Sequence, residues 1–62
     1  MDEWQTFFDA VERLDTAALQ DLDARLTPKR HASVDDSIVW AAYRMELVKR
    51  GANVVPVSYI ND

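Results

Sequence analysis

Two clusters of side chains in this sequence have the types and spacing that chemistry requires: the carboxylates Asp35 and Asp36, and the basic run Lys29, Arg30 and His31. Paired carboxylates can serve as general acid and base in a hydrolytic or proton-transfer site. Adjacent residues on a helix point about 100° apart, however, so Asp35 and Asp36 do not easily share one substrate. We therefore interpret both aspartates as groups that stabilise a helix N-terminus, where negative charge is favourable.

The basic run Lys29–His31 has two interpretations. Clustered cations can hold an anion, but three bases are too few for a nucleic-acid footprint. We favour a solvated loop and keep the anion contact as the functional alternative. Its histidine, His31, is the only one in the chain, and it cannot build a zinc site without several carboxylate partners.

Other catalytic and cofactor-binding patterns are missing from the sequence. The chain has no cysteine, which excludes disulfides and thiolate metal sites, and it has no Gly-rich phosphate loop or nucleophile motif. An enzyme needs acid, base or nucleophile groups positioned in a concave site. The sequence therefore predicts a protein that is not an enzyme, with no catalytic residue, no cofactor and no metal.

Length and charge narrow the function further. With 62 residues the chain is one domain, near the lower size limit for folding without disulfides or a bound metal. Oligomerisation or partner binding is therefore one expected source of stability. The net charge of −4 disfavours direct contact with a phosphate backbone, so we expect no direct nucleic-acid binding. There is no secretory signal and no apolar run of about 18 residues, so we expect a cytoplasmic protein, away from membranes. The composition is typical of bacterial or phage proteins.

The stretch 34–50 is the expected central helix, against which the other elements pack, because as a helix it carries two apolar stripes. One stripe runs through Val34, Ile38, Ala41, Met45 and Val48, and the other through Trp40, Tyr43 and Leu47. A surface helix needs only one apolar stripe, so both sides should be covered. We expect the Val34 stripe to pack against the first two helices, with Ile38 and Met45 in the core. The Trp40 stripe would then be closed by the tail or by another chain.

Two shorter helices are predicted before it, near residues 2–14 and 16–26. Each has an apolar face at helical spacing, led by Trp4 and Phe8 in the first and by Leu19 and Leu22 in the second. Asp15 or Thr16 can cap the second helix. Thr27 should end it, because the residue before a proline is pushed out of the helical conformation. The short link between them favours a helical hairpin.

The boundaries of the long helix also have sequence signals. Ser33 and Asp36 resemble a capping box at its start, and Gly51 is placed to end it. After Gly51 the tail is rich in strand-type residues, but Pro56 excludes a central strand. It can fold back over the Trp40 stripe, form a short extra helix or pair with a partner's sheet edge. We favour packing against the central helix of this subunit or a neighbouring one.

The fold prediction is therefore an all-α, compact three-helix domain over residues 1–62, with an apolar C-terminal tail that packs back or forms a short extra element. Trp and Tyr are enriched at binding hot spots, so the Trp40 stripe and the tail are the predicted contact surface for another protein or a second copy of the chain. The residues of this predicted surface are Trp40, Tyr43, Leu47, Val55, Tyr59 and Ile60.

Several features, in order along most of the chain, resemble the bacterial Hha/YmoA family. The matching pieces are Trp4 and Phe8, Leu14-Asp15-Thr16, Asp35-Asp36, Glu46-Leu47 and Val55-Pro56-Val57-Ser58. The resemblance implies a helical modulator of transcription that acts through a nucleoid-associated DNA-binding protein. The family's aspartate in the middle of the long helix has no match among Ala41, Ala42 and Tyr43.

Our first functional hypothesis is a small inhibitor or adaptor that acts by protein–protein binding, of the kind that phages and mobile elements encode. Its partner would be a protein, and a DNA-handling protein is one candidate. The first alternative is the Hha/YmoA-like modulator. The second is a structural small subunit of a larger assembly.

Overall fold

The computed structural model describes residues 3–52 and 54, and over these residues the chain is helical with no strand. The helices are α1 (Glu3–Glu12), α2 (Thr16–Leu26) and α3 (Val34–Lys49), with a short 3-10 turn, η1 (Thr27–Lys29), after α2. The predicted three-helix fold is confirmed, and two of the three helices start at the predicted residue. The predicted first helix ends two residues early, because residues 13 and 14 form a turn.

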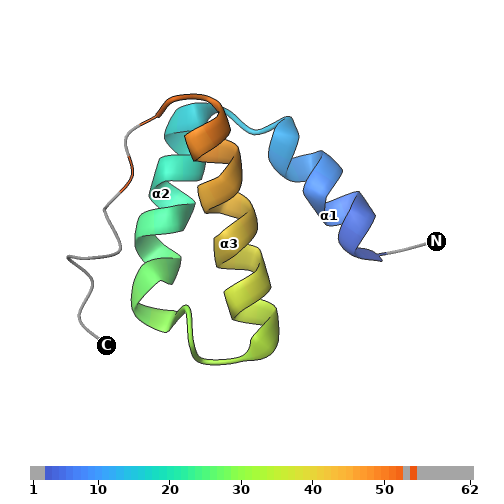
Figure 1. Ribbon diagram of the computed structural model, residues 1–62, viewed down its shortest axis with the longest axis vertical. Helices are drawn as coiled ribbons and strands as arrows, with labels where there is room; N and C mark the ends of the chain where they lie inside the picture. Colours follow the sequence, from blue (N-terminus) through green and yellow to red (C-terminus); the bar gives the residue numbers. More distant parts are fainter. Residues whose placement is uncertain (1–2, 53, 55–62) are drawn as a thin grey trace.

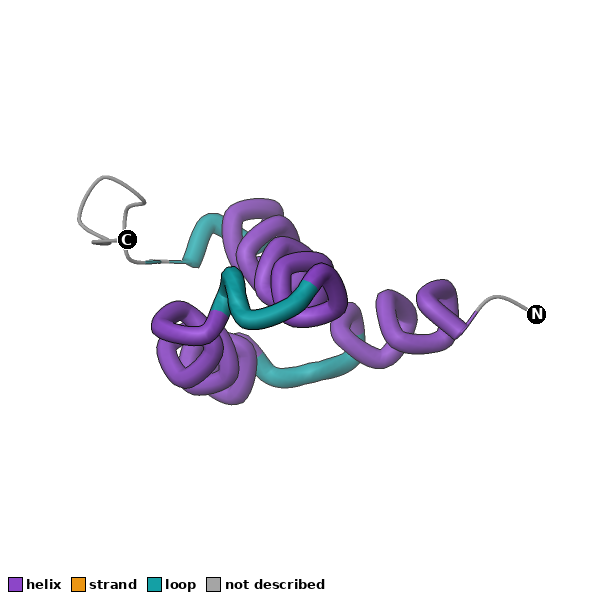
Figure 2. Tube along the Cα trace, turned by 90° about the horizontal axis from the view of Figure 1, so that it is seen from below, coloured by secondary structure: helices purple, strands orange, loops and turns teal. Residues whose placement is uncertain are grey.

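Helix α3 is the centre of the arrangement, and both other helices lie against it (Figure 1). Figure 2 looks along α3 and shows α2 and α1 on two different sides of it. The predicted hairpin of the first two helices is therefore wrong: α2 pairs with α3, and α1 packs mainly against α3. The link around Asp15 turns the chain away from α1 instead of reversing it onto α1.

The ends of α3 follow the sequence signals closely. At its start the Ser33 hydroxyl accepts a hydrogen bond from the Asp36 amide at 3.0 Å, which is the first half of a capping box. At its end Gly51 has a φ of +73°, a left-handed conformation that glycine adopts without strain. The amides of Gly51 and Ala52 then bond back to the carbonyls of Val48 and Leu47, both at 3.0 Å. This pair of bonds is a Schellman motif, and it satisfies carbonyls that the helix end leaves open.

The start of α2 follows its signal only in part. Asp15 occupies the N-cap position with an extended backbone, as predicted, but its side chain makes no capping hydrogen bond. At the other end, Thr27-Pro28 converts the helix into η1 rather than ending it outright. On its exposed side, α2 carries an i,i+4 ion pair between Asp21 and Arg25 at 3.0 Å.

The hydrophobic core takes one fully or almost fully buried residue from each helix: Val11, Leu19 and Leu47. Partly buried apolar side chains pack around these three, from α1, the links, α3 and the chain beyond it: Phe7, Leu14, Tyr43, Ala52 and Val54. The core therefore lies on the Trp40 side of α3. The prediction that the Val34 stripe forms the core is wrong, and Met45 is 72% exposed.

Arg50 fixes the position of α1 by binding the carbonyls at its end. Its guanidinium donates to the carbonyl oxygens of Leu14 at 2.7 Å and Glu12 at 3.0 Å, while its Nε donates to Glu46 Oε2 at 2.8 Å. These carbonyls lie at the C-terminal end of α1 and just beyond it, where a cation is also favoured by the helix dipole. The i,i+4 ion pair with Glu46 thus holds the Arg50 guanidinium toward the end of α1.

Replacing Arg50 with alanine should lower the free energy of unfolding by about 1.5–3 kcal/mol, the usual value for hydrogen bonds to a charged group. Urea denaturation followed by circular dichroism measures this loss. Arg50→Lys keeps the charge but not the planar fork, so it should recover only part of it. Full recovery by lysine would mean that charge alone, rather than the fork on the carbonyls, holds α1.

Candidate protein-binding face

The predicted contact residues of α3 point toward the interior. Leu47 is completely buried, and Tyr43 packs against the core with its ring centroid 5.9 Å from that of Phe7. Burial also raises the pKa of the Tyr43 phenol, which therefore stays neutral at physiological pH. α1 and α2 cover this stripe, so Leu47 is part of the core. The other predicted contact residues, Val55, Tyr59 and Ile60, lie outside the described residues.

The third residue of that stripe, Trp40, belongs to a polar layer between α2 and α3. Its indole nitrogen donates to Thr27 Oγ1 at 3.1 Å, and the Arg44 guanidinium lies over its ring at 4.6 Å from the centroid. Arg44 Nε in turn donates to Asp23 Oδ1 at 3.3 Å, in a buried salt bridge. These contacts join α2 and η1 to α3.

Arg30 also joins this layer, which corrects the interpretation of the basic run as a solvated loop. Only 5% of Arg30 is exposed; its guanidinium donates to the Thr27 carbonyl at 2.6 Å and lies 5.7 Å from the Trp40 ring centroid. Lys29 and His31 are exposed, as predicted for this loop. Sequence spacing does not reveal these two partners of Arg30, the Thr27 carbonyl and the Trp40 ring.

Within the part of the chain that the structure describes, three residues of the Val34 stripe stay exposed. In Figure 2 no described helix other than α1 and α2 lies against α3. Val34 is 75% exposed, Met45 72% and Val48 64%, whereas Ile38 and Ala41 are partly buried. Because exposed apolar side chains gathered on one face are unusual in a small monomer, this face is the strongest candidate for a contact surface.

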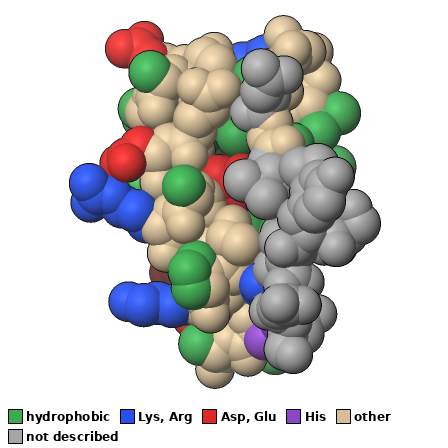
Figure 3. All heavy atoms as spheres, turned by 90° about the vertical axis from the view of Figure 1, so that its left-hand side faces the viewer, with side chains coloured by type: hydrophobic (Ala, Val, Ile, Leu, Met, Phe, Trp, Pro, Cys, Tyr) green, Lys and Arg blue, Asp and Glu red, His purple; other side chains and the backbone are tan. Residues whose placement is uncertain are grey.

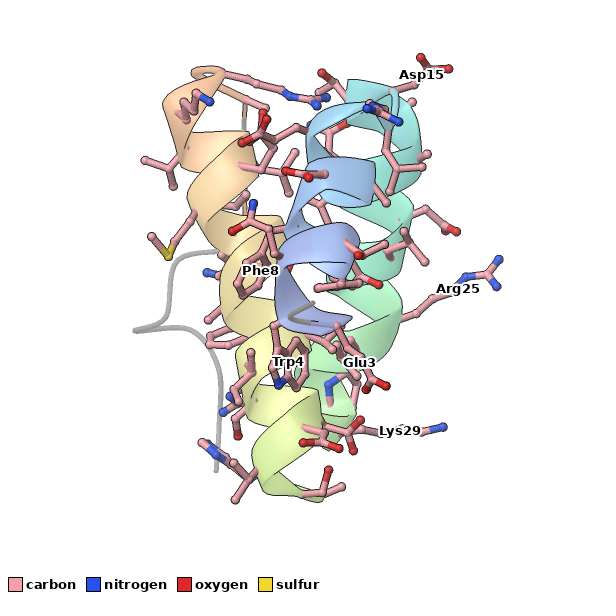
Figure 4. The ribbon with its side chains drawn as sticks, turned by 90° about the vertical axis from the view of Figure 1, so that its right-hand side faces the viewer. Glu3, Trp4, Phe8, Asp15, Arg25 and Lys29 are labelled. Atoms are coloured by element: carbon pink, nitrogen blue, oxygen red, sulfur yellow. The ribbon has the colours of Figure 1, made fainter. Side chains whose placement is uncertain are left out.

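A groove between α1 and α3 extends this surface. It has a volume of about 390 Å³ and is lined by the residues Phe8, Val11, Glu12, Ala42, Met45, Glu46 and Lys49. Figure 4 shows Phe8 pointing from α1 toward α3, while Arg25 and Lys29 project away from the helices. Phe8 is 38% exposed and stacks on Trp4, with 6.1 Å between their ring centroids.

We call the groove floor and the Val34 stripe together the open face; its apolar residues are Phe8, Val34, Ile38, Ala41, Ala42, Met45 and Val48. Its rim is charged in both signs, with Asp35 at one end of α3 and Lys49 at the other, and both residues are exposed. The side of the molecule over α2 is different, since acidic and basic side chains project there between scattered hydrophobic ones (Figure 3). The open face therefore has the apolar centre and polar rim of a protein-binding surface.

Other kinds of site find no support in the described part of the chain. Residues 3–52 and 54 contain no group of three side chains placed to hold a metal ion. None of their helices is long and apolar enough to cross a membrane. Asp35 and Asp36 both lie in the first turn of α3, where the helix dipole favours them.

No protein-family model, curated protein or solved structure matches the chain. The resemblance to the Hha/YmoA family therefore stays a prediction.

Proposed function

We propose that this chain is a non-enzymatic protein that acts by binding another protein chain, as an inhibitor or adaptor, and that the open face is its contact surface. The observation that carries the proposal is the exposure of the apolar side chains of Met45 and Val48 on α3, 72% and 64%. Burying an apolar side chain of this size on association is favourable by about 1.5–3 kcal/mol.

The groove beside α3 suits a helical or extended segment of a partner. Phe8 supplies an aromatic wall, and Ala42 keeps the floor low so that a partner's side chain can enter. Glu12, Glu46 and Lys49 stand at its edge and can select partners by charge. An amphipathic helix lying in an apolar groove is a common mode of recognition.

The test is affinity capture from cells that make the protein naturally, with three baits compared. Met45→Asp places a charge in the centre of the open face, and Ala24→Asp places the same charge on the exposed side of α2. We expect at least one captured chain, either a different protein or an untagged copy of this one, to be retained by the wild type and by Ala24→Asp but lost by Met45→Asp. Circular dichroism should show equal helical signal for all three baits.

Identical captures by the two aspartate variants would contradict the proposal, because the open face would then carry no partner. If the partner is an enzyme, adding the purified wild-type chain separates the classes of function. An inhibitor lowers the enzyme's activity, whereas a structural subunit forms a stoichiometric complex and leaves the activity unchanged.

A further inference from the structure

The open face of α3 has the spacing of a coiled-coil seam. Its residues recur at alternating intervals of four and three positions, through Val34, Ile38, Ala41, Met45 and Val48. This alternation is the a/d repeat that two helices use when they pack along their length. A surface helix that only covers its own core has a broader apolar face. The seam therefore favours another helix as the occupant.

The charges beside the seam specify the direction of that helix. One flank carries Asp35, Ala42 and Lys49, each seven residues from the next. When two copies of α3 pair antiparallel, equivalent flanks face each other, so Asp35 meets the second copy's Lys49 and Ala42 meets its own equivalent near the two-fold axis. A parallel pair instead sets this flank against the opposite flank of the second copy, which places Lys49 beside the second copy's Arg44, a like charge. Only the antiparallel pair is complementary in charge.

Side-chain size fits the same register. With Asp35 opposite the second copy's Lys49, Met45 lies opposite the second copy's Ala41 and Ile38 lies opposite its Val48. The long, adaptable methionine thus meets a small residue in two symmetric layers, which lets the helices approach closely. On the other flank, Arg44 does not oppose its own equivalent, because Asp23 and Trp40 hold its guanidinium within its own subunit.

We propose that the occupant of the open face is a second copy of this chain, paired through α3 in antiparallel orientation. This inference rests on the proposed function, since it names the partner of the same face. The two-fold pair covers Met45 and Val48 in both subunits. It also closes the groove between α1 and α3, because Phe8 lines that groove together with Ala42 and Lys49 of the facing flank.

Charge exchange tests the orientation. Asp35→Lys places lysine against lysine in its own pair, and Lys49→Asp places aspartate against aspartate. In sedimentation equilibrium over a concentration series, each variant alone should therefore dimerise roughly tenfold more weakly than the wild type. A mixture of the two variants should restore association, because both ion pairs then re-form across the two chains. Equal dimerisation of the wild type and of both single variants would overturn the antiparallel arrangement.

Cysteine crosslinking tests it independently of stability, because the natural chain has no cysteine. Ala42→Cys should form a disulfide-linked dimer under mild oxidation, whereas Asp35→Cys alone should not. A mixture of Asp35→Cys and Lys49→Cys should crosslink to each other. Crosslinking of Val48→Cys to itself would show a parallel pair, in which equivalent seam residues meet, and would overturn the inference.

The two proposals fail in distinguishable ways. A wild-type chain that stays monomeric in sedimentation, while Met45→Asp still loses a different captured protein, overturns the dimer and leaves the proposed function standing. A dimer that survives Met45→Asp overturns the inference directly, since the open face would not be its interface. If Met45→Asp changes neither the oligomeric state nor the captured proteins, both proposals are wrong.

Discussion

Replacing Asp23 with alanine should lower the free energy of unfolding by about 3–5 kcal/mol, because it leaves a buried guanidinium without its counter-charge. Asp23 is 3% exposed and its carboxylate accepts the Arg44 Nε hydrogen bond between α2 and α3. Within the described residues Arg44 Nη2 already has no acceptor, so the loss of Asp23 would leave that buried cation still less satisfied. Chemical denaturation followed by circular dichroism measures the change.

Two controls separate the cost of an unpaired buried charge from the effect of alanine on helix propensity. Asp21 forms a similar pair with Arg25 on the exposed side of the same helix, so Asp21→Ala should cost less than about 1 kcal/mol. The double change Asp23→Leu with Arg44→Met removes both charges and should recover much of the stability that Asp23→Ala loses. A loss from Asp23→Ala no greater than that from Asp21→Ala would contradict the importance of the buried pair.

The helices were predictable because their limits are set by residues close in sequence. Ser33 caps α3 through an amide three residues away, and Gly51 ends it because a left-handed turn is needed at that point. Periodicity likewise identified the two apolar stripes of α3. It also indicated that two shorter helices could not cover both of them. These conclusions need only the local geometry of a helix.

Which stripe faces inward was not predictable from periodicity, because both stripes have helical spacing. The decision depends on contacts between distant residues: Arg44 shares the Trp40 side of α3 and finds Asp23 at a separation of 21 positions. Arg30 adds to the same side by lying near the Trp40 ring. A hydropathy pattern treats an arginine as solvent-exposed, so it does not place the side of α3 that carries Arg44 in the core. For this reason periodicity favours the Val34 stripe as the buried one.

Because the Trp40 stripe and not the Val34 stripe faces inward, the candidate site lies on the opposite side of α3 from the predicted one. The two shorter helices cover one stripe of α3, as expected, but the exposed residues are Met45 and Val48 instead of Trp40 and Leu47. The groove residue Phe8 was predicted as part of the apolar face of the first helix, but its partial exposure depends on the angle between α1 and α3. Arg50 contributes to that angle through carbonyls of the α1 end, and no spacing rule reveals such contacts.

The second large expected effect is the difference in stability between variants on the buried and the exposed side of α3. Leu47 is fully enclosed among Val11, Leu19 and the residues around them, so Leu47→Ala should create a cavity and lower the free energy of unfolding by about 2–5 kcal/mol. Small domains have little stability to spare, and this change could unfold the chain outright. Met45→Ala removes a side chain of similar size from the opposite side of α3, where it is mostly exposed, and should cost no more than about 0.5 kcal/mol in the monomer.

Thermal melts of both variants at successive dilutions make the comparison decisive, because association stabilises a folded chain more as its concentration rises. At the lowest concentration Leu47→Ala should melt far below the wild type, and Met45→Ala should melt beside it. As the concentration rises, the wild type should gain stability that Met45→Ala does not, because only the wild type keeps the methionine at the seam. If Met45→Ala were instead the more destabilised variant at every dilution, the Val34 stripe would be the core and the Trp40 stripe would be the surface that a partner covers.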